Sequence, residues 1–124
     1  MEKQVIYGNI PSKSNSYKIV TINDHASLAK TKAVKDYEKS FYIQCNKYRE
    51  ANIQGYFELY ADVFFPSERN DLDGMLKVFM DCLQSCKAIK NDNKCVKLFL
   101  RKFKDAKNPR VEFVLKEINL ENAD

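Results

Sequence analysis

A period of two in the apolar side chains from Tyr56 to Phe65 is the clearest structural signal in the chain. Every second residue from Phe57 is apolar, whereas two of the intervening positions are acidic. A period of two is typical of a strand with one buried face. Pro66 then ends the strand, because proline cannot donate a hydrogen bond to a neighbouring strand. The pattern predicts a core formed by Phe57, Leu59, Ala61, Val63 and Phe65.

Two other segments show the three- and four-residue spacing of an amphipathic helix. One runs from about Thr31 to Arg49 and the other from about Asp71 to Lys87. Asn23, Asp24 and Ser27 precede the first segment and are candidates for a helix start. Each apolar stripe predicts a helix that covers a sheet with one face. The stripes comprise Val34, Tyr37, Phe41, Cys45 and Tyr48 in the first helix, and Leu72, Leu76, Phe79, Leu83 and Cys86 in the second.

Short apolar runs predict the remaining strands, at residues 5–7, 17–22, 95–103 and 110–118. Val96, Leu98 and Leu100 are expected on the core face of the third of these, and residues 104–109 are expected to connect the last two as a hairpin. The element order β(β)αβαββ predicts an α+β fold of two layers. In this fold two helices cover one mixed or antiparallel sheet of about four strands.

Length and composition limit the remaining possibilities. A chain of 124 residues is expected to form one domain over residues 1–124, since it suffices for one core but not for two. No apolar run approaches the ~20 residues of a membrane span, and the chain starts without a secretory signal, so a cytoplasmic protein is expected. Cys82 and Cys86 could share a helix face, but the only histidine is His25 and no CxxC occurs. Free thiols are therefore favoured over structural zinc.

Charge is distributed unevenly along the chain. Residues 13–49 contain eight basic and three acidic side chains, and residues 86–110 contain nine basic and two acidic ones. The acidic segment at residues 50–85, with two basic and seven acidic side chains, lies between them. An ordinary solvated surface can have this pattern. The alternative is a surface that binds a polyanion around a cluster of carboxylates, which a bridging cation would reconcile with phosphate.

The candidate chemistry begins at Asp71 and Asp73, where a strand gives way to a helix. Acids at a helix start are common without any function, because the free amide groups there favour them. Lys77 follows Asp73 by four residues, on the same helix face, and Asp92 lies in the loop after the helix. If that loop doubles back, three carboxylates and a lysine converge. Such a set suits Mg²⁺ or Mn²⁺ and phosphodiester hydrolysis.

At this point the sequence resembles the RusA-like Holliday junction resolvases, endodeoxyribonucleases of phages and prophages. The resemblance is strongest in Asp71-Leu72-Asp73, Lys77, Asp81 and Asp92, and extends to the Pro11-x-Lys13-x-Asn15 loop and the expected closing β-hairpin. Gly74 departs from the family pattern, which often has Asn there, as does the segment Ser67-Glu68-Arg69-Asn70, where family members can carry an arginine run.

The resemblance implies a homodimer in the cytoplasm of a bacterial host. Such a dimer cuts four-way DNA junctions by paired symmetric nicks with Mg²⁺, and needs neither a membrane nor a nucleotide cofactor. Asp71, Asp73 and Asp92 would be the catalytic metal ligands, and Lys77 the catalytic lysine. Asp81 is expected to be structural. The DNA contacts would be Lys13, Asn15, Arg69, Lys90, Lys94, Lys97 and Arg101.

Two alternatives stay open. The chain could be a dimeric branched-DNA-binding protein of the same fold whose catalysis is vestigial. It could also be an interaction protein in which the acids cap a helix and the basic residues are merely solvated. Metal-dependent cleavage separates the enzyme from both.

Overall fold

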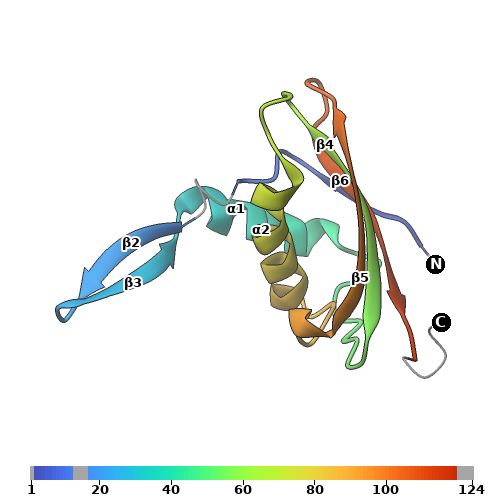
Figure 1. Cartoon of the computed structure of the whole chain (residues 1–124), viewed down its shortest axis with the longest axis horizontal. Coiled ribbons are helices and arrows are strands. Elements are labelled where there is room, and N and C mark those ends of the chain that lie inside the picture. The colour runs from blue at the N-terminus through green and yellow to red at the C-terminus, as the bar shows by residue number, and fades with distance from the viewer. Residues whose placement is uncertain (1, 13–16, 120–124) are drawn as a thin grey trace.

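Two helices and a four-stranded mixed sheet form the body of the protein, in the predicted α+β arrangement (Figure 1). The computed structural model describes residues 2–12 and 17–119. The elements are β1 (Gln4–Tyr7), β2 (Tyr17–Ile22), β3 (His25–Lys30), α1 (Lys32–Gln44), β4 (Phe57–Phe65), α2 (Leu72–Ser85), the short 3₁₀ helix η2 (Asp92–Lys94), β5 (Cys95–Lys104) and β6 (Arg110–Glu117).

Strand β4 lies inside the sheet, whose order is β1-β6-β4-β5. It runs parallel to β5 and antiparallel to β6. The expected hairpin between β5 and β6 is therefore wrong, since β4 lies between these two strands. The reason is the crossover through α2, which returns the chain to β4 in the parallel direction and leaves the other edge of β4 for β6.

The predicted core face of β4 is confirmed, because its alternate residues are buried along the whole strand. Three phenylalanines join the layers: Phe41 of α1 and Phe113 of β6 both pack on Phe79 of α2, with ring centroids 5.7 and 5.0 Å apart. The prediction that Val96, Leu98 and Leu100 of β5 belong to the core is wrong in part. Val96 and Leu98 remain 42% and 45% exposed, because β5 is an edge strand that the helices cover incompletely.

The segment before α1 also differs from the prediction. Asn23 and Asp24 do not start a helix but form the turn between β2 and β3, with φ of 51° and 65°. Left-handed backbone at both turn residues is what a two-residue hairpin of the I′ type requires, and Asn and Asp tolerate it. Helix α1 itself spans Lys32–Gln44, and the stripe residues Cys45 and Tyr48 are buried in the turns that follow it.

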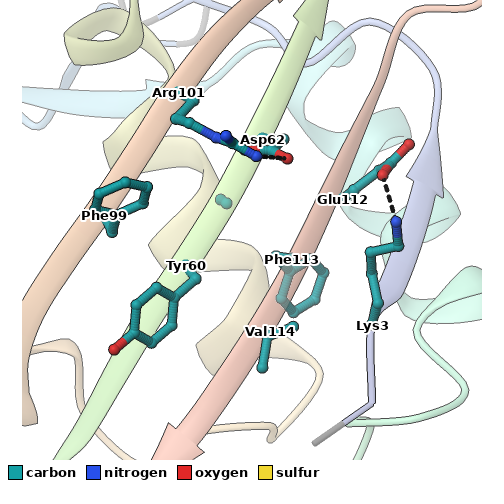
Figure 2. A pocket seen from close by; sticks show the side chains of 9 residues that line it. Lys3, Tyr60, Asp62, Phe99, Arg101, Glu112, Phe113 and Val114 are labelled. Atoms are coloured by element: carbon teal, nitrogen blue, oxygen red, sulfur yellow. Dashed lines mark hydrogen bonds and ion pairs between the residues drawn. The ribbon is translucent and has the colours of Figure 1, made fainter.

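Both helices lie on the same side of the sheet (Figure 1). The opposite side, called the open face below, displays side chains from β4, β5 and β6. Phe99 and Phe103 are 51% and 39% exposed there. Figure 2 shows Tyr60 and Phe99 beside the Arg101–Asp62 and Lys3–Glu112 pairs, around a pocket of about 210 Å³.

Candidate active site

The candidate site is built around the first turn of α2, which follows β4 after a short bend. Asp71 is the N-cap of this helix, and its Oδ1 accepts a hydrogen bond of 2.8 Å from the backbone N–H of Gly74. The carboxylate thereby satisfies one of the helix's free amide groups. Asp71 thus has a structural role that Asp73, two residues later and inside the helix, does not share.

Asp73, Lys77 and Asp92 line one pocket of about 500 Å³ between α2 and β5. The loop after α2 therefore does double back, as the sequence required. Apolar side chains form the rest of the lining: Leu76, Met80, Cys95 and Leu98. The pocket combines two carboxylates and an ammonium with a partly apolar wall.

The position of Asp92 is fixed through its backbone. Its N–H donates a hydrogen bond of 2.9 Å to Oε1 of Gln84, in the last turn of α2. Two residues earlier, the N–H of Lys90 donates a hydrogen bond of 3.0 Å to the carbonyl of Ile53. These two anchors hold the loop against the body of the protein and leave the Asp92 side chain available to the pocket.

Lys77 has a neighbour on its own helix. Its Nζ lies 3.6 Å from Oδ2 of Asp81, one turn further along α2, and its side chain is 49% exposed. Asp81 also acts electrostatically on Lys30, whose Nζ lies 2.6 Å from Glu38 of α1. The hydrogen bond that Lys30 donates to Glu38 raises the pKa of Lys30. Asp81 thus lies near the ion pair of Lys30 and Glu38, which connects the end of β3 to α1.

The donor set fits a hard divalent cation through two carboxylates. Among residues 2–12 and 17–119, no three His, Cys, Asp or Glu side chains lie close enough together to hold a metal ion. Asp71, the third expected ligand, is engaged in its cap and does not line the pocket. Mg²⁺ commonly takes only one or two carboxylates and retains several waters, so Asp73 and Asp92 meet its requirements.

The expected DNA contacts fall into two groups. Arg69 is exposed in the bend before Asp71, and Lys90 and Lys94 lie on either side of Asp92. The Lys94 ammonium is 4.9 Å from the centre of the Tyr56 ring. These three residues are close to the pocket in sequence. Lys13 and Asn15 lie outside the described residues.

Lys97 and Arg101 lie on the open face instead, on the other side of β5 from the pocket. Lys97 stands over the Tyr60 ring at 5.4 Å, and Arg101 donates two hydrogen bonds, of 2.7 and 2.8 Å, to Asp62 (Figure 2). The hydrogen bonding with Asp62 raises the pKa of Arg101. The structure therefore does not bring these two cations together with Asp73 and Asp92.

Sequence reasoning missed two residues that shape the site. Gln84 positions Asp92, and Lys102 donates a hydrogen bond of 2.9 Å to the carbonyl of Glu68, in the bend that precedes α2. Neither belongs to a motif. Gln84 lies outside the apolar stripe of its helix, and no pattern in the sequence signalled its role.

Comparison with known proteins shows the family of the chain. A family model of the endodeoxyribonuclease RusA matches residues 10–116, whereas no curated protein matches the chain. The matched range includes both helices, the pocket and β2 to β5. The chain therefore belongs to the RusA endodeoxyribonuclease family, whose members are Holliday junction resolvases. Within the described residues, no helix is long and apolar enough to cross a membrane.

Proposed function

We propose that this endodeoxyribonuclease resolves four-way DNA junctions by paired symmetric nicks, with Mg²⁺ as its metal and Mn²⁺ as an alternative. The observation that supports the proposal is the convergence of Asp73, Lys77 and Asp92 on one pocket from two separate segments. Two carboxylates beside a lysine suit a cation and a phosphate at the same place. A binding protein without catalysis would have no need for this arrangement.

Asp73 and Asp92 would hold the cation, and Asp71 would reach it by leaving its cap or through a bound water. When bound, the cation supplies a Lewis acid that activates water and offsets the charge that develops on the phosphate. Lys77 would bind a phosphate oxygen as a point charge. Its salt bridge to Asp81 would hold the ammonium near the pocket until DNA binds.

Arg69, Lys90 and Lys94 would contact the DNA backbone around the pocket. Phosphate binding by such residues releases counterions, so affinity should fall steeply with salt. Lys13 and Asn15 are proposed as further contacts from the N-terminal loop. Lys97 and Arg101 remain candidates only for DNA that also reaches the open face, because of where β5 places them.

We further propose a homodimer that works inside a bacterial host cell. Paired nicks at symmetric positions require two sites related by a twofold axis, and each chain supplies one pocket.

The test is cleavage of an immobile and a mobile-core four-way junction with Mg²⁺, beside linear duplex, single strand and a fork. Wild type, Asp73→Asn and the control Asp62→Asn are compared. Symmetric nicks by wild type and the control, lost in Asp73→Asn while junction binding is retained, would support the proposal. Binding without cleavage in Mg²⁺ or Mn²⁺ would replace it with the vestigial binding protein.

A further inference from the structure

The hairpin formed by β2, its turn and β3, residues 17–30, is here called the arm. Its strands pair with one another and form a sheet separate from that of the body. Figure 1 shows the arm projecting from the end of α1, away from both helices and the four-stranded sheet. An isolated two-stranded hairpin is at best marginally stable in water. We therefore expect the arm to pack against another surface.

The arm carries large aliphatic side chains on both of its sides. Ile19 and Leu28 lie opposite each other in the register and are 75% and 68% exposed. Ile22, three residues after Ile19, therefore points to the other side and is 61% exposed. Three exposed aliphatic side chains on one short hairpin favour association with an apolar surface.

The charges of the arm distinguish between a DNA and a protein surface. Its charged side chains are Lys18, Asp24 and Lys30, and the last of these is paired with Glu38 of its own chain at 2.6 Å. An arm that binds phosphates would need several cations free for them. Asp24, at the turn, would moreover repel a phosphate. Near-neutral charge with exposed aliphatics fits a protein partner.

A second copy of this chain supplies such a surface. The body has uncovered aliphatic side chains outside the arm and outside the pocket, among them Ile43 at 73% and Val96 at 42% exposure. In a twofold dimer, each arm meets the body of the other copy, so both sets of side chains leave water together. We propose that the arm docks on a second copy of this chain and forms part of the homodimer interface. This inference rests on the homodimer of the proposed function and identifies the segment that holds it.

The first test compares the monomer–dimer equilibrium of wild type with the double variant Ile19→Ser, Leu28→Ser by sedimentation. The expected result is a dimeric wild type and a dissociation constant raised about tenfold or more in the variant. Far-ultraviolet circular dichroism and Tm should change little, because neither residue belongs to the core cluster. A dimer unaffected by the double substitution would overturn the inference.

The matched control is Lys18→Ser, which removes the arm's exposed cation and keeps its aliphatic side chains. Dimerisation and junction affinity should both remain at the wild-type level. A clear loss of junction affinity would mean that the arm contacts DNA, and would overturn the inference.

A direct test places the photo-crosslinker benzoylphenylalanine at position 28. Illumination without DNA should yield a covalent two-chain species, and peptide mapping should find the second chain's body at the other end of the link. Linkage to junction DNA alone, or a monomeric wild type at micromolar concentration, would overturn the inference. Junction cleavage is measured in parallel. If wild type is dimeric but does not cleave the junction, the proposed function is refuted and the arm contact still stands.

Discussion

Carboxylates on the two sides of the β-sheet are used in opposite ways. On the open face, Asp62 accepts two hydrogen bonds from Arg101, and Glu112 lies between Lys3 and Arg110 at 2.9 and 2.8 Å. On the helix side, Asp73 and Asp92 line the pocket. Within the part of the chain that the structure describes, neither Asp73 nor Asp92 forms an ion pair with lysine or arginine.

The difference shows what makes a carboxylate available for metal binding. A carboxylate that is already bound by a guanidinium has its lone pairs occupied in the folded protein. Asp73 and Asp92 lie near Lys77, but Lys77 is drawn to Asp81, one turn away. Residue type and local charge alone would not show that Asp92, and not Asp62, is available to a metal ion. The difference lies in their partners, because Asp62 is bound by Arg101.

Removing a pocket carboxylate should have the largest effect on activity. In Asp92→Asn, we expect junction cleavage to fall by about 100-fold or more, because a ligand charge is lost where phosphate charge must be offset. Single-turnover cleavage measures the fall, with Tm as the check on folding. Tm should stay at the wild-type value, since the loop is anchored by the backbone N–H of Asp92. Wild-type cleavage in a folded Asp92→Asn protein would remove Asp92 from the site.

Asp71 allows its cap and its proposed ligand role to be separated. Asn is as good an N-cap as Asp, so Asp71→Asn should keep the stability of the protein, whereas Asp71→Ala should lose about 1 kcal/mol. Both variants should lower cleavage by about 10–100-fold if the carboxylate also serves the metal. Denaturant unfolding and junction cleavage are measured on each. Full cleavage by Asp71→Asn would show that the residue only caps α2.

On the open face, the same kind of substitution should affect stability and not catalysis. Asp62→Asn leaves Arg101 without its carboxylate, and a partly exposed pair of this type contributes at most about 1 kcal/mol. We expect a small fall in Tm with junction cleavage within about twofold of wild type. A large loss of cleavage would mean that the open face takes part in the reaction.

The smallest expected effect is on the pH dependence of stability, through the carboxylates that are paired with lysine or arginine. The hydrogen bond from Lys3, helped by Arg110, lowers the pKa of Glu112, and the hydrogen bond from Arg110 lowers the pKa of Asp105. A lowered pKa in the folded state gives stability that is fully present above the usual carboxyl range. That stability is lost as pH falls through the folded-state values. Tm measured from pH 7 downward should therefore decline less steeply in Glu112→Gln than in wild type. Parallel curves would show that the pair is too well screened to matter.

The sequence predicted the parts of the fold in which periodicity follows burial. Strand β4 and the stripes of both helices each have one buried face, so their apolar spacing was unambiguous. In the arm, the strand at residues 17–22 was predicted and is confirmed as β2, but its partner β3 was not predicted, because Leu28 is apolar yet exposed. The pairing of β5 was also beyond the pattern. Neighbouring strands usually form hairpins, whereas the helix crossover decided this case.

The site was predicted as far as spacing along a helix allows. Asp73 and Lys77 are one turn apart, so their common face followed from the sequence, and the return of Asp92 depended on a loop that does turn back. The separate role of Asp71 depends on N-cap geometry, which two neighbouring acids do not reveal in advance. The expected core face of β5 does meet α2, since Leu98 lines the pocket. The same alternation places Lys97 and Arg101 on the other side of the strand from Asp73 and Asp92.

The parallel pairing of β4 with β5 has a consequence for the order of folding. The two strands are paired from Phe57 opposite Cys95 to Phe65 opposite Lys104, across the whole of α2. Closing a loop of this length costs chain entropy before any strand contact repays it, so such pairings form late. The wall of the pocket contributed by Cys95 and Leu98 exists only after this step. In a chain that is still folding, the candidate site is therefore incomplete until β5 has paired with β4.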